Sequence, residues 1–436
     1  MSGPQPSSLR AEPQLRERLG RIDASAHFPE GALPVSIDQP RADAILARAA
    51  WSRIAEPGDG AAGALLAALG AEAALELLVK GTSPSKLRET SVAAGAELPL
   101  RALEEALGRW LPRLDRNETI ADIERAFAAR MRVVLPGDEG WPAALDDLGL
   151  HAPTMLWVRG RVECLDTPSL SVVGARAATG YGSHVTAEIV DGVCTAGLSI
   201  VSGGAYGIDA VAHRTALAAG APTVAVLAGG ADRPYPRSHD RLFESIAEQG
   251  AVCAEMVPGS SPTRWRFLQR NRIIAALSAA TLVTEAGLRS GSLNTAGHAA
   301  QLGRAVGAVP GPITSPASAG CHRLVRDYTA TLVTTAREAC ELLGLDDELA
   351  LSGSGGGLLG GGSETGGGDE DRELVWQRRV RDALPLRGSR TLAEISKNAG
   401  LAPGQVRGVL AELDLLGMAR RHEQPGGAPP RWSLIR

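Results

Sequence analysis

Residues 169–176 have the sequence SLSVVGAR, a short apolar segment that ends in a glycine turn and an arginine. Similar segments rich in Val, Leu or Ala recur downstream, and most are followed by a glycine turn and an amphipathic segment. This alternation predicts an α/β fold with a Rossmann-like, doubly wound and mostly parallel sheet. Ligands of such sheets lie beyond the carboxyl ends of the strands, so the turns there form the candidate site. The predicted strands are Ser169–Val173, Leu198–Ser202, Thr223–Ala228, Ala251–Glu255, Thr281–Thr284, Ala305–Val309 and Thr331–Val333.

The composition limits the kinds of partner. A chain of 436 residues can form two or three domains, and its formal net charge of -4 excludes a uniformly basic surface for nucleic acid. Any anion site must therefore be a local patch. Arginine supplies nearly all of the positive charge, because lysine occurs only at Lys80, Lys86 and Lys397. Aromatic residues make up 3% of the chain, which argues against a platform of many stacked rings.

The cysteines and the N-terminus indicate a cytoplasmic protein. The 5 cysteines are widely spaced, without a CxxC motif or a zinc-ligand spacing with histidine, so we expect reduced, buried thiols and no metal site. The first residues lack the apolar region of a secretory signal, and no apolar segment has the length of a membrane span. We therefore expect no membrane partner.

The sequence divides into five predicted parts. Residues 1–40 are rich in Pro, Ser and charge and are expected to form a disordered leader. Short helical segments at 41–130 predict an all-α N-terminal unit, and 131–345 hold the Rossmann-like domain. Residues 346–372 form a Gly/Ser-rich linker. Residues 373–436 combine three helical segments with a hairpin, which is typical of a winged-helix domain.

For each of the two flanking domains, the sequence is compatible with more than one role. The turn at Glu56–Gly60 is similar to that of a SAM or helix-hairpin-helix unit, which often binds nucleic acid, but its acidic character favours packing or partner binding. In the winged helix, Gln405 and Arg407 are placed to contact bases, whereas Glu412 and Asp414 would repel phosphate. Duplex binding and partner binding are both possible roles for this domain.

The first two glycine turns argue against a nucleotide cofactor. Gly174 is followed by glycines at 180 and 182, which is not the G-x-G-x-x-G spacing, and the second predicted strand ends in Ser202-Gly203 without an acidic residue. The chain also lacks a Walker A lysine, so we expect no cofactor. Asp209 lies near a helix start, where a capping role is favoured over that of a base.

A second cluster of charge occupies residues 265–278, WRFLQRNRIIAALS, where Arg270 and Arg272 flank Asn271. A strand and a loop of small residues follow, and the next helix is predicted to begin at Ser292. Guanidinium groups and the free N–H groups of a helix N-terminus bind phosphate. On a continuous helix, residues two apart point about 200° apart. Both arginines can therefore contact phosphate only in a loop or a first helical turn; otherwise one of them is structural.

These turns and arginines suit a chain of phosphates better than one small ligand. We therefore predict a site for single-stranded DNA with no catalytic residues. Its predicted residues are Gly174, Arg176, Ser202, Gly203, Gly204, Gly229, Gly230, Arg270, Asn271, Arg272, Ser290, Gly291 and Ser292.

The order of these motifs resembles the DNA-processing protein A (DprA/Smf) family. The matching segments are 141–160, 174–182, 202–209, 229–236, 267–275, 285–296 and 308–311. Gly174-Ala175-Arg176 departs from the usual Gly-Ser-Arg, and Leu268-Gln269 lacks the proline common before the second basic cluster. The resemblance implies a homodimer that protects incoming single-stranded DNA and loads the recombinase RecA in natural transformation or recombination. It also implies DNA contacts by Arg176, Arg270, Asn271 and Arg272.

Two other functions compete with this interpretation. A nucleotide phosphoribohydrolase has a related sheet, and Arg270 and Glu285 could imitate its catalytic arginine and glutamate. The segment Thr284–Gly287, however, lacks the double glycine of those enzymes. The other competitor is a winged-helix regulator that binds duplex DNA.

Overall fold

The computed structural model describes residues 11–25 and 37–345, and part of the segment 380–435. The chain forms two compact units, residues 1–356 and 357–436. The predicted linker at 346–372 lies outside the described residues, as do residues 1–10 and 26–36 of the predicted leader.

The first unit is built on a nine-stranded sheet with the order β1-β2-β6-β5-β4-β3-β7-β8-β9. The strands from β3 to β9 are mutually parallel, which confirms the predicted mostly parallel sheet. The antiparallel strands β1 and β2 were not predicted; they pair with each other, and β2 pairs with β6. The strands span Arg132–Val134 (β1), Leu156–Gly160 (β2), Ser169–Gly174 (β3), Ser199–Ser202 (β4), Thr223–Leu227 (β5), Ala251–Ala254 (β6), Ala280–Glu285 (β7), Ala305–Ala308 (β8) and Thr331–Leu332 (β9).

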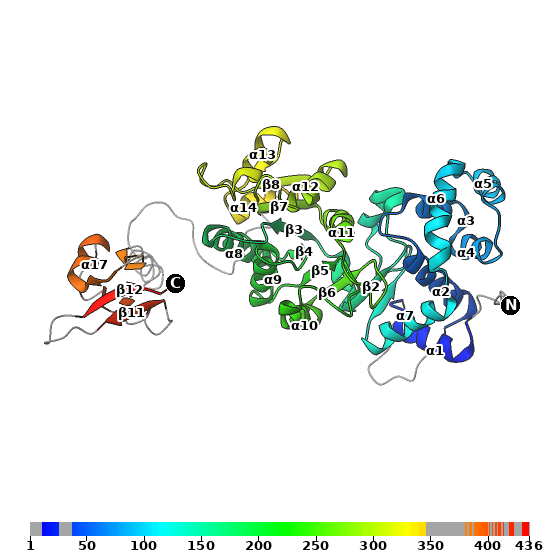
Figure 1. Cartoon of the computed structure of the whole chain (residues 1–436), viewed down its shortest axis with the longest axis horizontal. Helices are drawn as coiled ribbons and strands as arrows, with labels where there is room; N and C mark the ends of the chain where they lie inside the picture. The colour runs from blue at the N-terminus through cyan, green and yellow to red at the C-terminus, as the bar shows by residue number, and fades with distance from the viewer. Residues whose placement is uncertain are drawn as a thin grey trace. The chain divides into compact units, whose positions relative to one another are not determined.

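Helices cover both faces of this sheet (Figure 1). Helices α8, α9, α10 and α14 pack on one face, and α11, α12 and α13 pack on the other. Both faces are covered, so β3 is buried up to its last residue and β7 along its whole length. The order of the strands reverses between β3 and β7, where such folds form a crevice. The helices span Gly180–Thr195 (α8), Ile208–Ala218 (α9), Asp240–Gln249 (α10), Arg264–Leu277 (α11), Ser292–Gln301 (α12), Ala319–Asp327 (α13) and Ala336–Glu341 (α14).

Among the described residues, seven α-helices precede the sheet and form the helical part of the first unit. Aspartates at 38, 59 and 115 start three of them by accepting hydrogen bonds from free backbone N–H groups. At the centre, the rings of Trp51 and Trp110 meet edge to face at 5.2 Å between centroids. The helices span Pro13–Ile22 (α1), Gln39–Ile54 (α2), Gly60–Leu69 (α3), Ala71–Val79 (α4), Pro84–Ala93 (α5), Leu100–Trp110 (α6) and Arg116–Ala128 (α7).

The leader was wrongly predicted to be disordered over residues 13–22, which form α1. Its apolar face, with Leu15, Leu19 and Ile22, is buried against α7 and α2. Arg41 of α2 fixes the chain just after α1, because its guanidinium binds the carboxylates of Asp23 and Asp138 in two bidentate pairs of 2.7–2.9 Å. The charged residues of α1 face outward, which made the segment resemble a polar leader.

The structure also shows the state of the cysteines and the length and polarity of the described helices. All 5 cysteines are buried and free, as predicted. Among the described helices, no single one is long and apolar enough to cross a membrane; α3 and α4 pass that test only as a pair bent by 109°.

The second unit contains a small sheet with the order β10-β12-β11. Its strands are Arg390–Thr391 (β10), Ala419–His422 (β11) and Arg431–Leu434 (β12), and β10 leads directly into helix α17, Leu392–Ala399. Buried apolar residues, among them Ile395, Leu410 and Trp432, form its core. The assignment of this unit as a winged helix stays a prediction.

Glu56 connects the helical part to the rest of the first unit. It follows α2, and its carboxylate accepts two hydrogen bonds of 2.9 Å from Arg266 of α11 and one of 2.7 Å from Arg113. Burial alone would raise the pKa of Glu56, but the hydrogen bonds and charges of the two arginines outweigh it and leave the pKa below 4.5.

This ion pair predicts an acid-dependent stability. Because the pKa of Glu56 is lower in the folded state, the stabilisation is complete above the unfolded pKa and is lost as pH falls through the folded pKa. Replacing Glu56→Gln should lower the free energy of unfolding by about 1–3 kcal/mol at pH 7. In denaturant titrations, this difference between the two proteins should shrink progressively below pH 4.5. A difference that is constant from neutral to acid pH would show that the charge of Glu56 is not what matters.

Candidate nucleic-acid interface

The predicted turns meet at one edge of the sheet. Residues 174–176 end β3, 202–204 end β4, 229–230 follow β5 and 290–292 follow β7. These strands are neighbours in the order β5-β4-β3-β7, so the four turns lie side by side across the reversal of strand order. The sheet therefore brings together segments that are more than a hundred residues apart in the sequence.

Helix α11 supplies a buried positive charge beneath the turn that follows β4. The Arg270 Nη1 donates a 2.6 Å hydrogen bond to the backbone oxygen of Val226, and the residue is only 5% exposed. A Cβ at Gly203 would lie 2.0 Å from that Nη1, so a side chain there would displace the buried guanidinium. Burial lowers the pKa of Arg270 to about 10, which still leaves it charged at neutral pH.

Asp209 lies under the same turn. Its carboxylate accepts a 3.3 Å hydrogen bond from the backbone N–H of Ala205, just before α9 begins at Ile208. Burial raises the pKa of Asp209, and the positive charge of Arg270 acts in the opposite direction. The capping role expected for Asp209 is wrong, because α9 has no side-chain cap and Asp209 is its second residue; its carboxylate fixes the preceding turn instead.

An exposed arginine and aromatic rings lie above this buried charge. The Arg176 guanidinium carbon is 5.0 Å from the centre of the Phe267 ring, and that of Arg270 is 5.8 Å from the same ring. Tyr235, which is half exposed, meets Phe267 at 5.9 Å between centroids. The low aromatic content concealed this cluster. The spacing of three between Phe267 and Arg270, which places both on one side of a helix, was the available signal.

Two further cations belong to the segments that carry Tyr235 and Phe267. Arg237 follows the Tyr235 loop, and Arg264 begins α11 beside Trp265, which is 57% exposed. Within the described part of the chain, Arg176, Arg237 and Arg264 are exposed and form no ion pair. Sequence reasoning did not include Arg237, Arg264 or the aromatic residues in the site.

Asn271 shapes the last of the four turns. Its Nδ2 donates to Asn294 Oδ1 at 3.2 Å and to the Gly291 oxygen at 3.4 Å. The hydroxyl groups of Ser290 and Ser292 lie 2.7 Å apart, and α12 begins at Ser292 as predicted. Asn271 thus holds the loop before α12. The first three N–H groups of this helix are bound by the same loop, through the Ser290 hydroxyl and the Ser290 and Gly291 oxygens.

Arg272 points away from this edge. Residues 264–277 form one continuous helix, so Arg270 and Arg272 lie on opposite sides of it. The Arg272 Nη2 donates to Glu255 Oε1 at 2.8 Å, and its Nε donates to the His151 oxygen at 2.8 Å. Arg272 is 3% exposed. The helical spacing left each arginine either a phosphate contact or a structural role. These contacts give Arg272 the structural role.

Glu285 has a structural partner as well. Its carboxylate accepts hydrogen bonds from the Thr179 N–H at 2.8 Å and the Thr179 hydroxyl at 2.6 Å, at the start of α8. Glu285 is 2% exposed. Among the described residues, no cluster of three or more potential metal ligands occurs.

Several known proteins are similar to this chain. A family model described as DNA recombination-mediator protein A matches residues 132–344. A putative DNA processing protein DprA of Mycobacterium tuberculosis is 39% identical over 409 residues, which cover 89% of this chain and 94% of the relative. Protein Smf of Escherichia coli is 44% identical over 192 residues, or 44% of this chain and 51% of the relative. The X-ray structure of DNA processing protein A from Streptococcus pneumoniae superimposes with a TM-score of 0.55 and 29% identity, covering 68% of this chain and 96% of that one.

The close approach of Arg270 to the β4 turn gives a direct test of the site geometry. Gly203→Ala should lower the free energy of unfolding by about 1–3 kcal/mol, because the new Cβ and the buried guanidinium cannot occupy the same space. Gly180→Ala, at the start of α8, is the matched control, since a Cβ there meets no atom within 4 Å. Chemical denaturation of both variants measures the difference. Equal stabilities would mean that Arg270 does not lie under the turn.

Proposed function

Because the chain belongs to the DNA processing protein A family, we propose that the edge formed by the four turns binds single-stranded DNA. The observation that carries the proposal is the exposed Arg176 stacked on Phe267, beside glycine turns at the ends of four neighbouring strands. This combination offers a cation for phosphate, rings for bases and open backbone for close approach.

Each part of the edge has a distinct task. Arg176 and the nearby Arg237 and Arg264 attract phosphates. At 203–204 and 229–230, glycine lets the DNA strand approach the backbone where a side chain would prevent it. The N–H groups of Gly230, Ser290 and Ser292 already have hydrogen-bond partners within the protein. Arg270 supplies positive charge from beneath the turn, and Asn271 positions the loop before α12. Arg272 is assigned to packing and not to DNA.

The aromatic residues favour unpaired over paired bases. Phe267 and Tyr235 can stack only with a base whose face is accessible, and bases in a duplex are already stacked on one another. Fluorescence anisotropy with labelled single- and double-stranded oligonucleotides tests this preference. Equal or tighter binding of duplex would overturn the single-strand proposal.

The wider biological role is also a proposal. The name of the matching family, a recombination mediator, supports a function in protecting single-stranded DNA and loading RecA, as a homodimer, in transformation or recombination. A pull-down with the cognate RecA, after nuclease treatment to remove DNA bridges, tests the partnership. The SAM-like or helix-hairpin-helix character of 41–130 and the winged-helix character of 373–436 belong to the same proposal.

The two competing functions gain less support. Glu285, the candidate acid of a phosphoribohydrolase, is bound to Thr179, and the hydrogen bond of Arg270 goes to a backbone carbonyl. Release of free base from nucleoside monophosphates would restore that alternative. In the second unit, Arg431 donates to the Ser389 oxygen at 2.7 Å, so this wing arginine already has a partner within the unit. Duplex binding by that unit stays a prediction.

Arg176 provides a quantitative test of phosphate binding. Log affinity for single strands falls with log salt by about 0.7 per neutralised phosphate. Arg176→Ala should therefore weaken binding similarly for every oligonucleotide sequence and reduce that slope by roughly 0.7. Arg101→Ala is the control, because Arg101 is a highly exposed arginine on α6. If Arg176→Ala keeps the parent slope and affinity, the phosphate site is wrong.

Phe267 provides a separate test of base stacking. Removing the ring by Phe267→Leu should weaken single-strand binding by about 1–3 kcal/mol, while the salt slope stays unchanged because no charge is lost. Tyr328→Leu removes an exposed ring just after α13, away from the four turns, and should leave the affinity as it was. A parent-like affinity of Phe267→Leu would exclude stacking on this ring.

A further inference from the structure

Helix α11 has two functional sides. Phe267 and Arg270 face the DNA-binding edge proposed above, whereas Arg266, Gln269 and Arg272 face the turn at residues 56–59 of the helical part. The same rigid helix is therefore in contact with the proposed DNA site and with the preceding helices.

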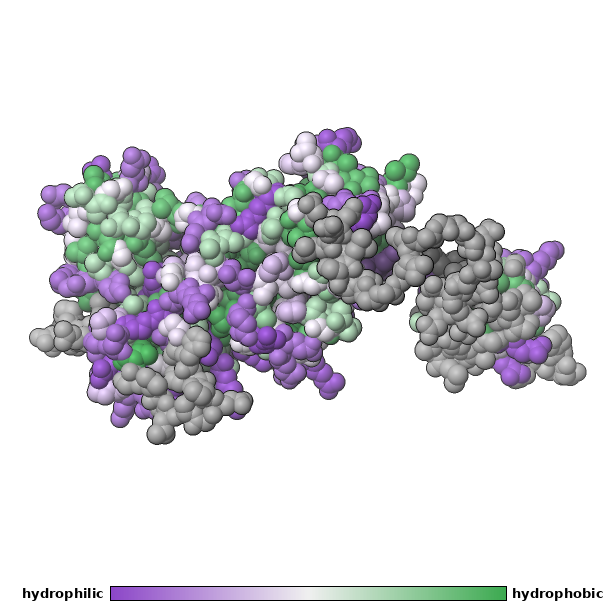
Figure 2. Space-filling model, turned by 180° about the vertical axis from the view of Figure 1, so that it is seen from behind, coloured by the Kyte–Doolittle hydropathy of each residue, from purple (hydrophilic) through white to green (hydrophobic). Residues whose placement is uncertain are grey.

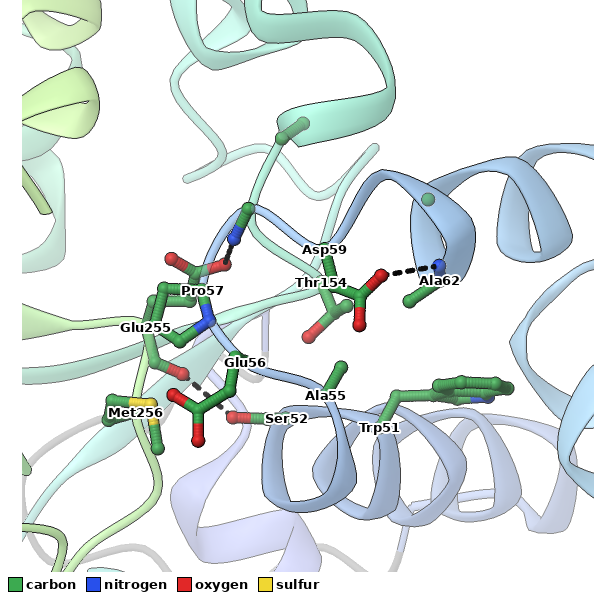
Figure 3. A pocket seen from close by; sticks show the side chains of 13 residues that line it. Trp51, Ser52, Ala55, Glu56, Pro57, Asp59, Ala62, Thr154, Glu255 and Met256 are labelled. Carbon is green, nitrogen blue, oxygen red and sulfur yellow. Dashed lines mark hydrogen bonds between the residues drawn. The ribbon is translucent and has the colours of Figure 1, made fainter. Parts of the chain in front are cut away.

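Two contacts hold the turn at 56–59 against α11 and the residue that follows β6. Glu56 binds the Arg266 guanidinium through both carboxylate oxygens at 2.9 Å. The Gly58 N–H donates to Glu255 Oε1 at 3.4 Å, and that same oxygen accepts the 2.8 Å hydrogen bond from Arg272. Figure 3 shows Glu255 beside this turn, with the Ser52 hydroxyl donating to its backbone oxygen at 2.7 Å.

The backbone conformation and the close neighbours of Gly58 both favour glycine at this position. Its φ is +73°, and a Cβ there would lie 2.7 Å from Gln269 Oε1 and 3.3 Å from Arg272 Nε. Its carbonyl oxygen lies 2.8 Å from His151 Nδ1. The backbone groups of Gly58 are thus engaged within the protein, although the sequence made this turn a candidate for contacting nucleic acid.

We propose that the turn at 56–59 fixes the position of α11 relative to the helical part, a role that we call a latch. Arg272 is the positioning residue that couples the position of this turn to the DNA-binding edge. The proposal rests on single-strand binding at that edge. Arg272 lies two residues from Arg270, about 3 Å along the helix axis. A shift of α11 that follows loss of the latch would move Phe267 away from Arg176 and Arg270 away from the Val226 carbonyl.

The alternative role is a brace, by which we mean that the turn contributes to folding stability without setting the position of α11. Arg53 provides the comparison, because it pairs with Glu118 and Asp122 inside the helical part. A brace predicts that any comparable loss of stability in the helical part weakens DNA binding equally. A latch predicts that only variants at the α11 contact do so.

The experiment measures single-strand affinity, salt slope and thermal stability of the full-length chain and its variants. Arg272→Met should weaken binding of a single-stranded oligonucleotide about 5- to 20-fold with an unchanged salt slope, because it touches no phosphate. Arg272→Lys should restore part of the affinity, since a lysine can still pair with Glu255. Arg53→Met should lower the thermal stability and keep the affinity within about twofold.

Each alternative outcome has a clear meaning. Parent-like affinity of folded Arg272→Met overturns the latch, and a slope lowered by roughly 0.7 would make Arg272 a direct phosphate contact. An equal loss in Arg53→Met reduces the helical part to a brace. If Arg272→Met fails to fold, Glu56→Gln replaces it, with the same expected loss of affinity at constant slope. Failure of the parent protein to bind single strands contradicts the proposed function, and hydrogen exchange then decides the latch: Arg272→Met, but not Arg53→Met, should expose the amides of α11.

Discussion

Two guanidinium groups are buried on opposite sides of one helix, and much of the first unit is arranged to satisfy them. A buried charge is costly unless hydrogen bonds and opposite charges compensate for it. Arg270 donates to the Val226 carbonyl and lies in the field of the Asp209 charge, and the absence of a side chain at Gly203 leaves room for its guanidinium. Arg272 finds Glu255 and the His151 carbonyl. Every residue of α11 from 270 to 277 is buried, so this helix needs neighbours on all sides.

The proposed site obtains its positive charge locally. The chain carries a formal net charge of -4, and Figure 2 shows hydrophilic and hydrophobic residues interspersed over the face of the first unit that it presents. What distinguishes the edge at β5-β4-β3-β7 is arginine without a carboxylate partner, next to backbone that glycine leaves uncovered. A parallel sheet concentrates such loops because all of its carboxyl ends lie at one edge.

The sequence allowed the architecture to be predicted better than the partners of individual side chains. The seven strands of the parallel sheet and the start of α12 at Ser292 follow from local patterns of apolar residues and glycine. Strands β1 and β2 were missed because β1 is three residues long and each is followed by a 3-10 helix instead of an amphipathic α-helix. The helical spacing showed that Arg270 and Arg272 must diverge, but it could not show which one faces the edge. That depends on Glu255, which lies on another element, and on a turn that comes from far earlier in the chain.

The helical part and the sheet also share one hydrophobic core. Leu19 and Ile45 from the first helices are buried together with Met155 and Trp157 of the β2 region and Val252 of β6. The Trp157 ring donates to the Ser52 hydroxyl at 3.0 Å, so even this polar contact is divided between the two parts. Their unfolding is therefore expected to be a single cooperative event. A chain shortened to the parallel sheet would expose an apolar surface along β2 and β6, so the helical part is not a module that can be lost or exchanged without rebuilding that surface.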